Sequence, residues 1–328
     1  MINRRRVLTL SFGAIVAPLA ALAQQPQGKV PRVGFLISET LSGQASRIEA
    51  LRAGLRDRGY VEGKNIAIEF RSAEGNYDRL PGLAAELADL KVDVLVAFGI
   101  KALAAASGAT TTIPIVIPAT SSDPVAMGLV GSLARPGGNV TGSTTFGPEI
   151  MAKRLEMLKD VMPGMTRVAV LVNPANPSFR AMFKQMDTAA KSLNLSLDAF
   201  EVRTPGEFDR AFAAMAKGRV DALVVQDDTI FGETNAKAIA ELAARQRLLA
   251  VGSKGFAEAG GTIGYGRTDE LYRRGAYFVD RILKGAKPGD LPIEQATRFE
   301  LVINMKIAKA IGIKIPQSVM LRADQVIE

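Results

Sequence analysis

The sequence contains neither cysteine nor histidine. Without cysteine the chain forms no disulfide and offers no thiol nucleophile, and without histidine it has no Ser-His-Asp triad and no histidine general base. The usual zinc sites, whose ligands are histidine and cysteine, are excluded for the same reason. These absences exclude particular classes of catalytic and metal site; our separate expectation is a protein that is not an enzyme, with no catalytic residue, no metal site and no cofactor.

The first 23 residues have the pattern of a cleavable signal peptide. Arg4–Arg6 precede an apolar run from Val7 to Leu22, and Ala21–Ala23 supplies the small residues that a signal peptidase reads, with cleavage after Ala23. The run is shorter than the roughly 20 apolar residues that span a membrane, which argues against the alternative of a retained anchor helix. Asn3–Leu8 resembles a twin-arginine export signal, and the general secretory route is the alternative.

The distribution of charge and the lack of cysteine indicate which partners and which compartment to expect. The net charge is +8, and it is +5 beyond the predicted signal peptide, which carries three arginines and no acid. Because these charges form no basic stripe, we expect no nucleic-acid binding. The lack of cysteine also excludes a lipid tether on an N-terminal cysteine, so an exported protein stays near the cell only behind a second membrane. We expect it in the periplasm.

Short apolar runs alternate with segments whose apolar residues recur every three or four positions. This pattern is typical of strands that alternate with helices around a parallel sheet. The predicted strands of the first half are 32–37, 65–70, 93–98 and 113–117, and those of the second half are 167–172, 195–202 and 221–225. The repeated layout predicts an α/β protein with two similar parallel-sheet lobes, and a single doubly wound domain is the alternative.

Segments rich in glycine and proline mark where the chain passes between the lobes. We predict crossings near Thr144, near Tyr265 and after 285–292. The first lobe would then comprise 24–144 and 267–293, and the second 145–266 and 294–328. Two lobes joined by several segments form a hinge that closes on a ligand.

The residues after each predicted strand are the candidate ligand-binding residues, because ligands of parallel sheets bind at the carboxyl ends of the strands. In the first lobe these candidates are Ser38, Glu39, Gly99, Ile100, Lys101, Ser122 and Asp123. In the second lobe they are Asn173 and Asp227, with Phe146 and Tyr265 beside the first two crossings.

These side chains suggest which ligand groups they bind. A helix that starts after Gly99, together with Lys101, suits a carboxylate, whereas Asp123 suits an ammonium group. The rings of Phe146 and Tyr265 would stack on a ligand. The alternatives are roles in turns and caps for the asparagine and the aspartates, a solvated position for the lysine, and a core position for the phenylalanine.

Several sequence blocks resemble a known family. They include Gly54–Asn65, Ser122–Val125 followed by Ala134–Gly142, Asp280–Gly285 and Phe299–Asn304. In these blocks the chain resembles ABC-transporter substrate-binding proteins of the tryptophan/tyrosine-binding-like type, which have the type 1 periplasmic-binding fold. Relatives often have Gly, then Ser or Thr, then Pro after the third strand, where this chain has Gly99-Ile100-Lys101.

The resemblance implies a monomeric periplasmic component of an ABC import system. Such a protein captures a small molecule by hinge closure and delivers it to a permease in the inner membrane. We expect an anionic or zwitterionic ligand, and the resemblance adds aromatic amino acids as candidates. The alternatives are a ligand-sensing module for a membrane receptor, and a hydrolase that uses Asp123 and Asp227 across the cleft.

Overall fold

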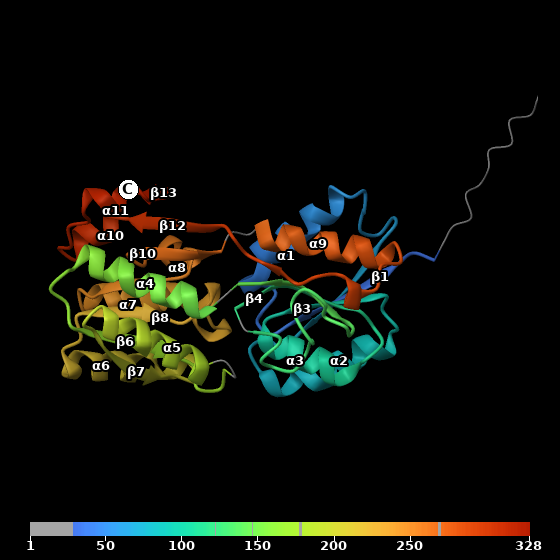
Figure 1. Ribbon diagram of the computed structural model, residues 1–328, viewed down its shortest axis with the longest axis horizontal. Coiled ribbons are helices and arrows are strands. Elements are labelled where there is room, and N and C mark those ends of the chain that lie inside the picture. Colours follow the sequence, from blue (N-terminus) through green and yellow to red (C-terminus); the bar gives the residue numbers. More distant parts are fainter. Residues whose placement is uncertain (1–28, 122, 146, 177–178, 268–269) are drawn as a thin grey trace, which may run out of the picture. The chain divides into compact units, whose positions relative to one another are not determined.

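The computed structural model describes residues 29–121, 123–145, 147–176, 179–267 and 270–328. The predicted signal peptide, Ser122 and Phe146 therefore lie outside the described residues. The part from Pro31 to Glu328 is one unit by its internal contacts, and it contains two β-sheets flanked by helices (Figure 1). Within the described residues, no helix combines the length and the apolar character needed to cross a membrane.

The first sheet has six strands, and all of its pairs are parallel. The strands, in their order across the sheet, are β11 (Glu294–Gln295), β5 (Val140–Thr144), β4 (Ile115–Thr120), β3 (Val94–Phe98), β1 (Arg32–Ile37) and β2 (Ala67–Ser72). We call this sheet and its helices the first lobe.

Helices cover both faces of the first sheet, because successive side chains of a strand point to opposite faces. Phe35 packs into a core with α1 (Ala45–Arg56) and α9 (Glu270–Leu283). Its neighbour Leu36 packs into a second core with α2 (Leu80–Asp89) and α3 (Ile100–Ala109) (Figure 1). A strand that is buried on both faces is apolar throughout, which explains the continuous runs in the sequence.

The second sheet has seven strands, and β10 pairs antiparallel with β12 while the other pairs are parallel. The strands, in order, are β13 (Gln325–Ile327), β12 (Phe299–Asn304), β10 (Ile263–Arg267), β9 (Leu249–Gly252), β8 (Ala222–Val225), β6 (Arg167–Val172) and β7 (Ser196–Glu201). We call this sheet and its helices the second lobe.

The second lobe also has a core on each face of its sheet. One core takes side chains from α4 (Gly147–Val161), α5 (Phe179–Ser192), α10 (Met305–Ala310) and α11 (Gln317–Met320). The other takes side chains from α6 (Phe208–Gly218), α7 (Glu233–Arg245) and α8 (Lys254–Glu258). Short 3-10 turns are η1 (Ser42–Gln44), η2 (Tyr77–Arg79), η3 (Pro205–Glu207), η4 (Thr229–Phe231) and η5 (Pro288–Asp290).

The fold confirms the predicted α/β class with two lobes, and the antiparallel β10–β12 pair is a difference from the expected parallel sheets. The strand predicted at 65–70 begins two residues later. Asn65 belongs to the preceding turn instead, since its side chain accepts from the Val61 N–H and donates to the Gly59 carbonyl.

The chain passes from the first sheet to the second between β5 and α4, returns between β10 and α9, and passes again between β11 and β12. Because β11 pairs with β5, Glu294 and Gln295 belong to the first sheet, two residues beyond the boundary predicted at 293. Gly142 of β5 has φ +136°, and a Cβ there would overlap the carbonyl of Ile117, so glycine is required just before the first crossing.

Candidate functional site

A cavity of about 440 Å³ lies between the two lobes. Its lining comes from segments that follow β1, β3 and β4 of the first lobe and β6, β8, β9 and β10 of the second. These are the carboxyl ends of the strands, where parallel sheets bind ligands. The volume lies within the usual range of small-molecule sites.

The cavity brings six of the predicted site residues together. They are Glu39, Gly99, Ile100, Lys101, Asn173 and Asp227, from both lobes. Lys101 lies in the first turn of α3, whose first N–H groups have no partner inside the helix. The positive end of the helix dipole and the ammonium group of Lys101 both favour an anion at this edge.

Three predicted residues do not line the cavity. The Ser38 hydroxyl is buried and donates to the Phe98 carbonyl at 3.2 Å. Asp123 is exposed, and its Oδ1 accepts from the N–H groups of Val125 and Ala126, so it closes its own turn. Asp123 and Asp227 are therefore not assembled as a catalytic pair.

The third of these residues is Tyr265, whose ring packs into the core of the second lobe. It lies 5.8 Å from the ring of Phe299, measured between centroids. Burial raises the pKa of its hydroxyl. Its backbone carbonyl accepts two hydrogen bonds from Arg154, so this tyrosine is connected to the site through that arginine.

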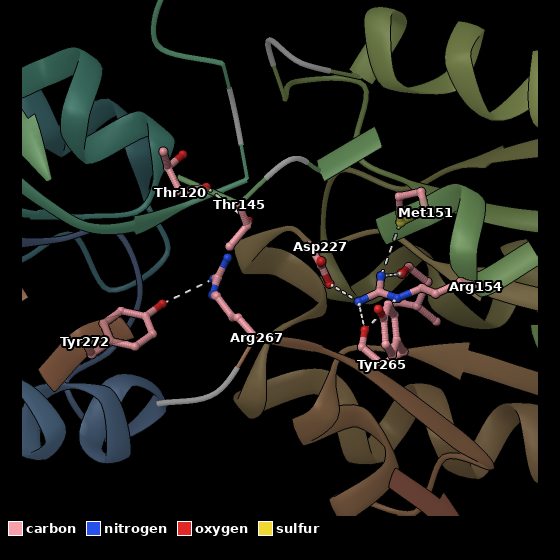
Figure 2. Close-up of polar contacts among 9 residues, drawn as sticks. Thr120, Thr145, Met151, Arg154, Asp227, Tyr265, Arg267 and Tyr272 are labelled. Carbon is pink, nitrogen blue, oxygen red and sulfur yellow. Dashed lines mark hydrogen bonds and ion pairs between the residues drawn. The ribbon is translucent and has the colours of Figure 1, made fainter. Parts of the chain in front are cut away.

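Asp227 is held by Arg154, a residue of α4 that the sequence analysis did not single out (Figure 2). The Arg154 Nη2 lies 2.8 Å from Asp227 Oδ1, and the side chains are 0% and 20% exposed, respectively. The arginine also donates to the carbonyls of Tyr265 and Val225 and to the sulfur of Met151. Asp227 lines the cavity, and the buried Arg154 holds it from behind.

Asp228 organises the adjacent part of the wall. Its Oδ1 accepts from the Asn173 side chain and from the Ile230 N–H, both at 3.0 Å, and its Oδ2 accepts from the Asn176 side chain at 2.7 Å. The Asn173 N–H in turn donates to Gln226 Oε1 at 2.8 Å. These bonds connect the loops that follow β6 and β8.

Arg267 and Tyr272 lie on either side of the second crossing (Figure 2). The Arg267 Nη2 donates to the Tyr272 hydroxyl at 3.2 Å. The Tyr272 ring stacks on Phe98 with centroids 6.0 Å apart, and the guanidinium carbon of Arg47 lies 5.5 Å from its centroid. Arg267, Tyr272 and Arg47 line the cavity, so this part of its wall carries one aromatic ring and two cations.

The two lobes touch beside the cavity. The Tyr77 hydroxyl of the first lobe is hydrogen-bonded to the Thr229 hydroxyl of the second. Burial, followed by the negative charge of Asp228, raises the pKa of Tyr77 well above its usual value. A Cβ on Gly43 would also contact the hydroxyl of Thr234. A solute in the cavity therefore contacts both lobes at once.

Helical segments also supply residues to the cavity lining, such as Arg47, Tyr77 and Tyr272. These were not among the predicted candidates, because the candidates were chosen at the ends of strands. A signal for Arg154 was present, because Met151, Arg154, Leu155 and Leu158 recur at helical spacing and place a charge on an apolar face. Charged side chains are rarely buried unless they are paired. Among the described residues, no group of three acidic side chains is arranged to hold a metal ion.

Comparison with known proteins identifies relatives along nearly the whole described chain. A family model described as "ABC transporter substrate binding protein" matches residues 37–327. The tyrosine-binding protein of Clostridioides difficile (strain R20291) is 27% identical over 263 residues, which cover 79% of this chain and 74% of the relative.

Two solved structures are similar in fold and sequence. A conserved domain protein from Vibrio cholerae is 27% identical, with a TM-score of 0.85 over 91% of this chain and 100% of that one. The ABC domain in complex with L-Trp from Streptococcus pneumonia is 25% identical, with a TM-score of 0.84 over 90% of this chain and 99% of that one. More distant structures share the type 1 periplasmic-binding fold alone.

Proposed function

Because the chain belongs to the family of ABC transporter substrate-binding proteins, we propose that it captures a small solute in the cavity between its lobes and delivers it to a membrane permease for import. The observation that carries this proposal is the cavity itself, whose walls come from the strand ends of both lobes. A solute there binds best when the lobes are together, so it shifts the population toward that state.

The energy that this clamp requires is modest. Shifting an equilibrium from 1:99 to 99:1 takes about 5.5 kcal/mol of differential binding. Hydrogen bonds to charged groups contribute roughly 1.5–3 kcal/mol each, so two to four of them are sufficient. Lys101 of the first lobe and Asp227 of the second are placed to supply such bonds.

We propose that the solute is anionic or zwitterionic. The helix start at Ile100 and Lys101 favours a carboxylate, and Asp227 favours a donor group such as ammonium. The names of two relatives, a tyrosine-binding protein and a complex with L-Trp, make aromatic amino acids the first candidates. The chain would act as a monomer, without catalysis, in the periplasm after cleavage behind Ala23.

A ligand screen tests the proposal. The protein is unfolded in guanidinium chloride to strip bound solutes, refolded, and heated with single amino acids, aromatic acids, sugars and amines. We expect one chemical class to raise the melting temperature saturably, by mass action on the folded state. The bound solute should be recovered chemically unchanged.

A matched pair of variants shows whether the cavity is the site. Ser121→Trp introduces a large ring at the cavity wall and should abolish the rise in melting temperature, whereas Ser318→Trp on the exposed side of α11 should preserve it. Conversion of the solute would favour the hydrolase, and copurification with a receptor instead of a permease would favour the sensing module. A wild-type protein that takes up no solute would contradict the proposal.

A further inference from the structure

Arg154 uses the whole hydrogen-bonding capacity of its guanidinium group inside the second lobe. An arginine side chain has five N–H donors. Nε donates to the Tyr265 carbonyl at 3.0 Å, Nη1 to the Val225 carbonyl at 3.1 Å and to Met151 Sδ at 3.2 Å. Nη2 donates to the Tyr265 carbonyl at 2.7 Å and to Asp227 Oδ1 at 2.8 Å. The orientation of the group is therefore fixed at every donor.

Only one of these five bonds goes to a carboxylate. The Tyr265 and Val225 carbonyls belong to β10 and to the end of β8, and they hold the guanidinium independently of Asp227 (Figure 2). Because Arg154 is 0% exposed, water does not compete for these bonds, and the cation is fixed before any solute arrives. Burying a charge in this way is costly unless it is fully paired.

The two carboxylate oxygens of Asp227 differ in their hydrogen-bond partners. Oδ1 is bound by Arg154, whereas among the described residues no group donates a hydrogen bond to Oδ2. The side chain is 20% exposed and lines the cavity. The arginine thus holds an acceptor oriented in the wall of the cavity.

We infer that Arg154 is a positioning residue that fixes Asp227 as the acceptor for a hydrogen-bond donor of the solute, either an ammonium or a hydroxyl group. This inference rests on the proposed function. Arg154 does not touch the solute, because it does not line the cavity. It acts through Asp227, and it connects that residue to β10, the strand that leads into the second crossing.

The first test needs no ligand. Crystal structures of the solute-free protein are compared for the wild type, Arg154→Met and the control Leu158→Met, which alters packing on the same helix face. We expect Asp227 to keep its side-chain conformation in the control and to leave it in Arg154→Met. An unchanged Asp227 in Arg154→Met would overturn the inference. If Arg154→Met does not fold, Arg154→Lys replaces it, because lysine keeps the charge but lacks the planar fork of donors.

The second test uses three probes that share one skeleton: L-phenylalanine with an ammonium group, L-3-phenyllactate with a hydroxyl group, and 3-phenylpropionate with neither. Calorimetric titration of Arg154→Met should show about a 10-fold loss of affinity, or about 1.4 kcal/mol, for the probe whose donor Asp227 accepts. Its affinity for 3-phenylpropionate should change less than about 2-fold. The control Leu158→Met should change neither affinity.

The outcomes separate this inference from the proposed function. Equal losses for all three probes in Arg154→Met would indicate a merely structural role and would overturn the inference, whereas the proposed function would still stand because the wild type binds the probes. If the wild type binds none of the three probes, the role of Arg154 is judged only from the conformation of Asp227 in the solute-free structures. A wild type that binds no solute of any class refutes the proposed function instead.

Discussion

At the scale of single residues, Lys101 and Arg267 stand out within the cavity lining. Lys101 comes from the first lobe and Arg267 from the second, and neither forms an ion pair with a residue that the structure describes. Lys254, by contrast, lies 2.7 Å from Glu300, and Asp227 is paired with Arg154. We propose that these two cations bind a carboxylate of the solute.

Neutralising either cation should weaken the binding of a carboxylate solute. We expect Lys101→Gln and Arg267→Gln each to lower the affinity for 3-phenylpropionate, or for the acid that the screen identifies, by about 10-fold. The matched controls Lys64→Gln and Arg245→Gln remove exposed charges in the same lobes and should change the affinity less than about 2-fold. Titration calorimetry measures both, and equal effects of the cavity and control variants would contradict this role.

The predicted site residues that line the cavity share one property, which is that they lie within three residues of the end of a strand. Glu39, Lys101 and Asp227 could be found this way because strand ends are visible as the ends of apolar runs. Ser38 follows a strand too, but its hydroxyl turns back to the Phe98 carbonyl. Tyr272 could not be found, since it reaches the cavity only through the packing of α9 on the first lobe.

At the scale of elements, the packing of α9 on α1 assembles the first lobe across a long sequence separation. The two helices meet at Gly54 of α1, where a Cβ would overlap the backbone carbonyl of Arg273 and lie 2.8 Å from the Cβ of Ala276. On α9, Gly275 likewise leaves room for Leu51, which a Cβ would approach to 3.0 Å. The close approach of the helices therefore depends on glycine.

A pair of glycine substitutions with opposite expected signs tests this contact. Gly54→Ala should lower the free energy of unfolding by about 1–3 kcal/mol, because the methyl group forces the helices apart. Gly82→Ala in α2 should raise it by about 0.5–1 kcal/mol, since no atom lies within 4 Å of the new Cβ and alanine favours a helix. Urea unfolding of both variants is the measurement, and a stabilised Gly54→Ala would contradict the packing.

The elements that the sequence predicts well are the buried central strands. β1 and β6 have the predicted bounds, because apolar side chains on both faces give them continuous apolar runs. β11 spans only two residues and pairs with β5, which is far away in the sequence, so no local sequence pattern predicts this strand. The antiparallel direction of β12 depends on the third crossing, which brings the chain back to the far side of β10.

At the scale of the whole molecule, we propose a clamp whose solute lies between the two lobes. The lobes meet beside the cavity, where Tyr77 is hydrogen-bonded to Thr229 and Gly43 lies so close to Thr234 that a Cβ would overlap its hydroxyl. A solute should enter and leave only when these contacts separate. The absence of cysteine from the sequence makes the chain a clean background for locking them with one engineered disulfide.

The double substitution Gly43→Cys with Thr234→Cys supplies that lock. A Cβ at position 43 would contact the Thr234 hydroxyl, which places the two Cβ atoms within the reach of a disulfide. The protein is loaded with the solute that the screen identifies, oxidised, and passed through a desalting column, and the bound solute is counted before and after reduction. Thr234→Cys alone is the control, since it forms no intramolecular bridge and adds no atom at Gly43.

The retention of bound solute by this locked protein shows whether the solute lies between the lobes. We expect the oxidised protein to keep its solute through the column and through dialysis, and reduction to release it at the rate of the control. Exchange at the same rate in the oxidised and reduced protein would contradict the clamp, because the solute would then bind outside the cavity that the two lobes enclose.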